Sequence, residues 1–84
     1  MAHHKSALKR IRQTEKRRLR NRMYKSRMKT AIRRVREAET KEAAMEALKQ
    51  AYAVIDKLVS KGVIPRNRAA NKKSRLTRFV NSMA

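Results

Sequence analysis

Residues 61–65 read Lys61-Gly62-Val63-Ile64-Pro65, and they contain the only glycine and the only proline of an 84-residue chain. Glycine is favoured directly after the last residue of a helix, and proline is favoured in the first turn of a new one. The 61 residues before Gly62 are rich in Ala, Arg, Lys, Glu, Leu and Met, which are good helix formers. Gly62 and Pro65 therefore predict a boundary between two helices.

Thr40 predicts a second boundary. Its hydroxyl suits the N-cap of a helix, and Glu42 in the first turn would favour the helix dipole. We therefore predict helices over about 6–39, 41–61 and 65–82, after a flexible terminus over residues 1–5. Connections this short imply antiparallel neighbours, so the expected fold is all-α, an antiparallel three-helix bundle in a single domain that spans residues 1–84.

Apolar side chains gather on one side of each predicted helix when residues are placed at about 100° intervals. In the first helix this side is roughly 120° wide and occupies only the second half, whereas in the second helix it covers roughly 200°, which predicts contact with both neighbours. The apolar residues of the first helix are Tyr24, Met28, Ala31, Ile32, Val35 and Ala38. Those of the second are Ala43, Ala44, Met45, Ala47, Leu48, Ala51, Tyr52, Val54, Ile55, Leu58 and Val59, and those of the third are Ala69, Leu76, Phe79, Val80 and Met83. Packing is the expected role of both tyrosines, and the methionines Met23, Met28, Met45 and Met83 are expected in or near the core.

The first half of the first helix lacks such a side. Three arginines continue the line of the apolar residues, namely Arg10, Arg17 and Arg20. The apolar residues of this half point roughly the other way, and they are Leu8, Ile11 and Leu19. A helix over 6–39 would be about 50 Å long, against about 30 Å for the second helix. Its first five or so turns should therefore project beyond the bundle, and we expect them to be frayed or disordered until a ligand orders them.

The formal charge of +19, from 25 basic and 6 acidic residues, is unevenly distributed. Residues 1–36 hold 15 basic residues and one acid, residues 37–60 hold three basic and five acidic residues, and residues 61–84 hold seven basic residues and no acid. Such an excess of one sign costs the folded state self-repulsion. A polyanion is therefore the expected partner of the two cationic ends.

Several classes of function are disfavoured by composition. The chain has no cysteine, and no apolar run approaches the roughly 20 residues that cross a bilayer. We expect no secretory signal, because the basic N-terminus has no apolar segment behind it. His3 and His4 lack further ligands, so no metal is expected. No nucleophile–base pair, phosphate-binding glycine loop or carboxylate pair can be assembled, since the acids Glu37, Glu39, Glu42 and Glu46 are better explained as a solvent face. The expected protein is therefore no enzyme and has no cofactor, small-molecule substrate or membrane partner.

Basic residues around the whole circumference of a helix suit a site that phosphates enclose on several sides. Folded RNA offers such sites, whereas duplex DNA presents one groove to one face of a helix. Ten of the fifteen basic residues before position 37 are arginine, whose guanidinium pairs bidentately with phosphate. Five hydroxyl and amide side chains add neutral hydrogen-bonding groups for phosphate, 2′-OH or base edges: Ser6, Thr14, Asn21, Ser26 and Thr30. With only Tyr24, Tyr52 and Phe79 as aromatics, recognition of RNA shape and backbone is favoured over base stacking.

The predicted RNA-binding residues lie in the two cationic segments. They are Lys5, Ser6, Lys9, Arg10, Arg12, Lys16, Arg17, Arg18, Arg20, Asn21, Arg22, Lys25, Ser26, Arg27, Lys29, Arg33, Arg34, Arg66, Asn67, Arg68, Lys72, Lys73, Ser74 and Arg75. For the last four, a merely solvated surface is the main alternative, because exposed lysines are common.

Two blocks of sequence resemble the bacterial small-subunit ribosomal protein twenty family. The first comprises Lys5-Ser6-Ala7-Leu8-Lys9-Arg10-Ile11-Arg12, Glu15-Lys16-Arg17-Arg18-Leu19-Arg20-Asn21 and Tyr24-Lys25-Ser26-Arg27-Met28-Lys29-Thr30; the second comprises Lys61-Gly62-Val63-Ile64, Asn67 and Lys72-Lys73-Ser74-Arg75-Leu76. The similarity covers nearly the whole chain in order, although Pro65 and His3-His4 depart from the family pattern.

The resemblance implies a structural protein of the small ribosomal subunit, in the cytoplasm, whose long first helix lies among helices of small-subunit rRNA. It also implies an early-binding assembly role, with contacts to the 5′ domain and to the long stem near the 3′ end. We further expect few protein contacts and a monomer when the protein is free.

Three other functions are weighed against this one. The first is a DNA-binding chromatin-like or basic-region protein. A basic-region protein needs a dimerising zipper of several heptads, whereas the apolar stripe here lasts about two heptads. A membrane-surface helix would need an apolar face opposite its charges, which residues 9–22 lack. An enzyme is the weakest alternative, for want of a site.

Overall fold

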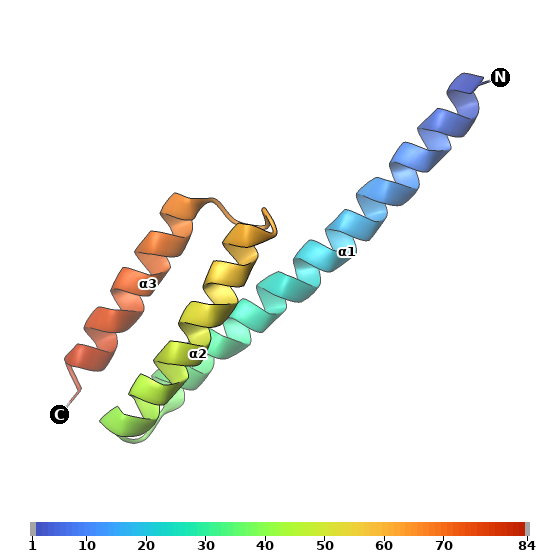
Figure 1. The fold of residues 1–84 in the computed structure, drawn as a ribbon. Coiled ribbons are helices and arrows are strands. Elements are labelled where there is room, and N and C mark those ends of the chain that lie inside the picture. Colours follow the sequence, from blue (N-terminus) through green and yellow to red (C-terminus); the bar gives the residue numbers. More distant parts are fainter. Residues whose placement is uncertain (1, 84) are drawn as a thin grey trace.

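The computed structural model describes residues 2–83, with side chains described from residue 5 onward. Over this range it contains three helices and no strand: α1 (Ala2–Glu37), α2 (Lys41–Ser60) and α3 (Arg66–Asn81), shown in Figure 1. The predicted all-α fold is confirmed. The bounds of α2 and α3 agree with the prediction to within one residue, and α1 ends two residues earlier than expected.

The start of α1 differs from the prediction. The flexible terminus was expected over residues 1–5, but α1 begins at Ala2. This stretch contains neither glycine nor proline, so nothing in it stops a helix. The apolar pattern used to place the boundary reports burial rather than helicity, and Lys5, whose side chain is described, is exposed. The side chains of His3 and His4 lie outside the described residues.

Both connections are built as their residues predict. Thr40 is the N-cap of α2, and its side-chain oxygen accepts a hydrogen bond from the backbone N–H of Ala43 at 3.1 Å. Gly62 has φ = +72°, a conformation that side chains disfavour. Its N–H donates to the carbonyl of Val59 at 3.0 Å, while the N–H of Val63 donates to the carbonyl of Leu58 at 2.9 Å, as in a Schellman motif.

The last helix begins one residue later than expected, at Arg66 instead of Pro65. Pro65 is the N-cap of α3 rather than a residue of its first turn, with φ = −67° and ψ = 151°. Its carbonyl accepts a hydrogen bond from the N–H of Ala69 at 3.2 Å. Between Gly62 and Pro65, Ile64 is buried to 6% exposure. The connection therefore reverses the chain and also contributes a core residue that helical periodicity did not identify.

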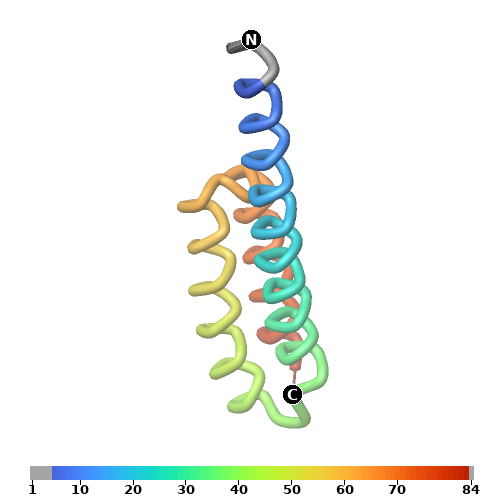
Figure 2. Tube along the Cα trace, turned by 90° about the vertical axis from the view of Figure 1, so that its right-hand side faces the viewer, coloured from blue at the N-terminus to red at the C-terminus, as the bar shows by residue number. Residues whose placement is uncertain are grey.

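The helix α2 lies between its two neighbours and packs against both, while α1 and α3 contact each other least. Figures 1 and 2 show the three helices running in alternating directions. The predicted contact of α2 with both neighbours is thus confirmed, although Ala43 and Met45 at the two edges of its predicted apolar side are exposed. The buried core consists of Met28, Ala31, Val35, Ala44, Ala51, Ile55, Leu58, Ile64, Ala69, Leu76 and Val80.

Four residues expected on the apolar sides of the helices or near the core are exposed. They are Ala43 and three larger residues, Met23, Met45 and Phe79, whose exposed fractions are 46%, 50% and 39%. Each lies at or beyond the margin of the apolar side of its helix, where three short helices leave the flank open to solvent. For Met23 and Met45 the expected gap-filling role is therefore corrected, whereas Met28 is buried and Met83 packs against the core.

The beginning of α1 projects beyond the bundle, as predicted. Every residue from 5 to 20 is exposed, and from residue 5 onward the first buried side chain is that of Met28. The Cα atoms extend 66 Å along the longest axis but only 21 and 13 Å across it. We call residues 5–23 the cationic arm. Figure 1 shows the N-terminal part of α1 extending beyond the ends of α2 and α3.

Core and arm should respond oppositely to truncation of a leucine. Leu58 is fully buried, so Leu58→Ala should lower the free energy of unfolding by about 2–5 kcal/mol. Leu19 is 65% exposed, so Leu19→Ala should change it by less than about 0.5 kcal/mol. Urea unfolding followed by circular dichroism measures both, and equal losses would contradict the observed separation of arm and core.

The arm should also open more readily than the bundle in the free protein. Its helix is held by backbone hydrogen bonds with no packed face, and isolated helical segments of this length are marginally stable. Backbone amides of residues 5–23 should therefore exchange with deuterium faster than those of residues 44–58, as followed by mass spectrometry. Equal protection of the two segments would show that the arm needs no ligand to be ordered.

Candidate nucleic-acid interface

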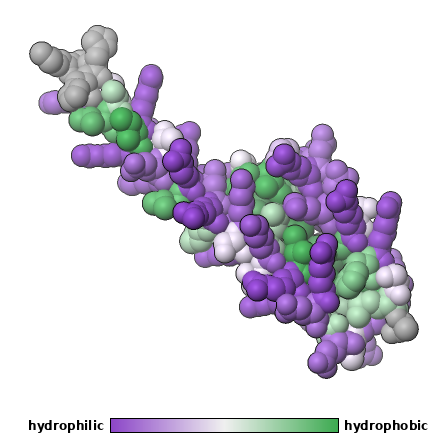
Figure 3. All heavy atoms as spheres, turned by 180° about the vertical axis from the view of Figure 1, so that it is seen from behind, coloured by the Kyte–Doolittle hydropathy of each residue, from purple (hydrophilic) through white to green (hydrophobic). Residues whose placement is uncertain are grey.

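The cationic groups of α1 are all available to a ligand. Each of its fifteen Lys and Arg side chains from Lys5 to Arg36 is exposed. Within the described residues, the structure records no ion pair for any of them. Figure 3 shows hydrophilic side chains along the arm and over the bundle on the face it displays. Unpaired charges of one sign at this density repel one another, so a polyanion that neutralised them would bind favourably.

Most of the predicted RNA-binding residues lie on α1, and the structure brings several of them together. A hollow of about 580 Å³ on the arm is lined by Thr14, Arg17, Arg18, Leu19, Asn21, Arg22 and Lys25. A second, about 280 Å³, is lined by Arg10, Ile11, Thr14, Glu15 and Arg18. Both lie on one helix between long side chains, so their shape depends on rotamers that a ligand can rearrange.

The neutral side chains of α1 differ in what they can still bind. Asn21 is half-buried at the base of the arm, and Ser26 is exposed. The Thr30 hydroxyl donates to the carbonyl of Ser26 at 3.1 Å, so its oxygen keeps acceptor capacity but its proton is already used. Thr30 can therefore accept from a base amino group or a 2′-OH more readily than it can donate to phosphate.

Helix α3 carries the second cationic surface. Arg66, Asn67, Arg68, Ser74 and Arg75 are exposed, and Lys72 is half-buried. A hollow of about 290 Å³ on this helix is lined by Arg68, Asn71, Lys72 and Arg75. Asn71 was not predicted as a site residue, although its spacing of three and four from its neighbours places it on the same helix face and could have identified it.

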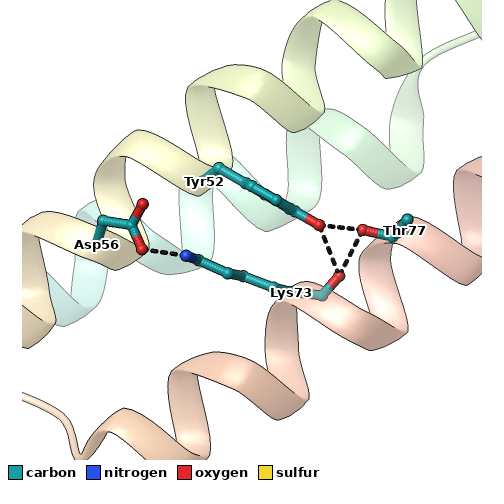
Figure 4. Close-up of polar contacts among 4 residues, drawn as sticks. All are labelled: Tyr52, Asp56, Lys73 and Thr77. Atoms are coloured by element: carbon teal, nitrogen blue, oxygen red, sulfur yellow. Dashed lines mark hydrogen bonds and ion pairs between the residues drawn. The ribbon is translucent and has the colours of Figure 1, made fainter.

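Lys73 differs from the other cations of the described residues because it forms an ion pair within the protein. Its Nζ forms an ion pair with Asp56 of α2 and lies 5.1 Å from the centre of the Tyr52 ring (Figure 4). The Thr77 hydroxyl donates to the Lys73 carbonyl at 2.8 Å, which leaves the Thr77 oxygen to accept from the Tyr52 hydroxyl. These contacts join α2 to α3 and turn the ammonium group toward the protein.

The position of Lys73 could have been inferred from the sequence. On α3 it lies near the line of Ala69, Leu76 and Val80, on the side that packs against α2, whereas Lys72 lies at its margin. Four residues make the polar contacts between α2 and α3 that Figure 4 shows, and we call them the α2–α3 clamp: Tyr52, Asp56, Lys73 and Thr77. It holds the cationic surface of α3 in a defined orientation on the bundle.

Four of the six acidic residues lie apart from the cationic arm, whereas Glu15 lies within it. Glu37, Glu39, Glu42 and Glu46 are exposed near the α1–α2 connection, in keeping with the expected solvent face. In the described part of the chain, no three His, Asp or Glu side chains are grouped so that they could hold a metal ion. Nor is any described helix both long and apolar enough to span a bilayer.

The family model and the relatives that match this chain all point to one protein family. The family model described as ribosomal protein S20 matches residues 2–81. A relative from Trichlorobacter lovleyi, named small ribosomal subunit protein bS20, is 57% identical over 99% of this chain and 99% of its own length. Relatives of the same name from Nitratiruptor and Syntrophobacter fumaroxidans are 57% and 52% identical, each over 99% of this chain, and are covered over 96% and 100% of their lengths.

The α2–α3 clamp predicts unequal effects of removing the two tyrosine hydroxyls. Tyr52→Phe should lower the free energy of unfolding by about 1 kcal/mol, because the half-buried Thr77 hydroxyl loses its donor. Tyr24→Phe is the matched control, since no hydrogen bond of the Tyr24 hydroxyl is recorded among the described residues, and it should change stability by a few tenths of a kcal/mol at most. Urea unfolding measures both; a loss for Tyr24→Phe as large as that for Tyr52→Phe would contradict the role of the clamp.

Proposed function

This chain belongs to the ribosomal protein S20 family, and from that premise we propose that it binds small-subunit rRNA directly and supports its folding and assembly. The family consists of structural proteins of the small ribosomal subunit and not of enzymes, which gives this chain a structural role on the cytoplasmic ribosome. The proposed contacts are made by the cationic arm, by the basic residues that follow it on α1, and by the cationic surface of α3.

The observation that carries the proposal is the projecting arm with unpaired cations on all its sides. A helix packed against other parts of a protein would need an apolar face. The arm has only scattered apolar residues, and Leu8, Ile11 and Leu19 among them are exposed. Convergent RNA helices present phosphates from several directions and so suit such a helix. Arginine dominates the arm, which favours bidentate pairing with phosphate.

The two cationic surfaces suit a partner with more than one RNA segment. α1 and α3 flank α2, so their exposed cations can meet separate stretches of RNA at the same time. In keeping with the family resemblance, we propose the 5′ domain of the small-subunit rRNA as the main partner, with further contacts to the long stem near the 3′ end. By binding both RNA regions at once, the protein would restrain their positions relative to each other during assembly.

Binding to a transcript of the 5′ domain should be steeply dependent on salt. If about 8–12 phosphates are neutralised, the logarithm of the association constant should fall with the logarithm of salt concentration with a slope of about −6 to −10. Filter binding between low and moderate salt measures the slope. Duplex DNA of equal length should compete poorly, and a slope near zero or equal competition by DNA would refute direct binding of this kind.

Reversal of arm charges should separate binding from folding. Arg17, Arg18 and Arg20 are exposed and unpaired in the described structure, so R17E/R18E/R20E should weaken binding by at least 100-fold while leaving the melting temperature of the bundle nearly unchanged. The matched control is K41E/K49E/K57E, which makes the same change in net charge on exposed positions of α2. Equal losses from the two variants would mean that net charge alone, and not the arm, determines binding.

A further inference from the structure

A groove lies between α1 and α2 just beyond the base of the cationic arm. Its volume is about 290 Å³, just below the range of roughly 300–1,000 Å³ that is usual for ligand clefts. The lining residues are Ser26, Arg27, Thr30, Ala31, Arg34, Ala47, Gln50 and Val54. Unlike the hollows of the arm, this groove has walls from two helices that pack against each other, so the fold fixes its base at Ala31, Ala47 and Val54, while exposed side chains form its rim.

The lining divides into an apolar part and a polar part. Ala31 is buried, and Ala47 and Val54 are half-buried at the contact between the helices. Alanine at position 47 leaves the space that a larger side chain would fill. Exposed side chains of the lining supply two guanidinium groups, a hydroxyl and an amide, from Arg27, Arg34, Ser26 and Gln50. No carboxylate is among the lining residues, so nothing in the groove itself repels an anion.

One guanidinium of the groove is held in place by its neighbours. Arg27 lies over the ring of Tyr24, with its Cζ 5.6 Å from the ring centre, and its Nη2 approaches the Sδ of Met23 at 3.9 Å. Tyr24 in turn packs against the core. A restrained guanidinium loses less side-chain entropy when it binds an anion or stacks on a flat ring than a mobile one does.

We propose that this groove binds a single unpaired nucleotide of the RNA, with the base against the apolar part and the phosphate at Arg27 and Arg34. This inference rests on the proposed function and adds to it a site that recognises a base. A phosphate alone would have no use for the apolar wall of Ala47 and Val54, whereas a base has an apolar face and a polar edge. The Gln50 amide both donates and accepts, as a base edge requires, and Thr30 offers an acceptor beside it.

The charge around the groove favours RNA as the occupant. The groove follows directly on the cationic arm along α1, so an RNA strand that leaves the arm reaches it without crossing an acidic surface. Single-stranded loops and bulges are where proteins read RNA bases, because an unstacked base exposes its face and edge together. The occupant is therefore a nucleotide of a loop or bulge next to the RNA segment bound by the arm.

Filling the groove tests the proposal without changing any charge. Ala47→Leu should weaken binding to the 5′-domain transcript by about tenfold, because it occupies the space of the base, and it should leave the slope of the salt dependence unchanged. The matched control is Ala53→Leu, an exposed alanine of α2 that does not line the groove, which should bind as the parent does. Thermal melting checks that both variants fold.

Chemical probing of the transcript identifies the nucleotide. Dimethyl sulfate and carbodiimide together modify the pairing edges of all four unpaired bases. One or two unpaired bases should be protected by the parent protein and by Ala53→Leu but exposed again with Ala47→Leu. Should Ala47→Leu fail to fold, Gln50→Ala at an exposed position takes its place, and it should weaken binding several-fold and restore reactivity at the same base.

The outcomes separate this inference from the function on which it rests. If the parent protein binds with a steep salt slope but Ala47→Leu or Gln50→Ala binds equally well and protects the same bases, the groove holds no base and the inference is wrong while the proposed function stands. If the parent protein shows no salt-dependent binding to the transcript, the proposed function itself fails. Protection of the RNA backbone alone, with no base protected, would also overturn the base site.

Discussion

The hydrophobic contact of α2 with both of its neighbours is the interaction on which the molecule depends. Ile55 and Leu58 of α2 are fully buried, as are Val35 of α1 and Val80 of α3. This core lies at one end of a molecule whose longest dimension is 66 Å. Because the apolar side of α1 begins only at Tyr24, the core cannot extend toward the N-terminus. The arm is therefore left with exposed charge and no packed face, which is why we propose that RNA stabilises it.

Much of this arrangement could be predicted from the sequence, because it follows from local rules. Thr40 and Gly62 identify helix ends through backbone chemistry that does not depend on the rest of the fold, and the arm follows from an apolar pattern that stops. The start of α1 was missed because a helix that buries nothing leaves no periodic signal. Ile64 was missed for a related reason, since it is buried in a connection where no period applies.

The candidate site was predictable as a set of residues but not as a set of contacts. The exposure of the arm's lysines and arginines follows from the absence of an apolar side. Lys73 reads as one more cation in a basic run, and its pairing with Asp56 emerges only when α3 is set against α2. Gln50 carries no signal of its own, because the groove that it lines with Arg34 exists only between two packed helices. Where a side chain acts through a partner on another helix, the relative placement of the helices has to be known.

The continuity of α1 has a mechanical consequence. The helix runs from Ala2 to Glu37 without a glycine or proline, so the part that meets the ligand and the part that belongs to the core are one rod. If RNA orders the arm as proposed, a rotation of the bound arm would rotate the bundle with it, and contacts of the bundle with a second RNA segment would fix the orientation of the arm. The continuous helix would then set both the distance and the angle between the two bound RNA segments.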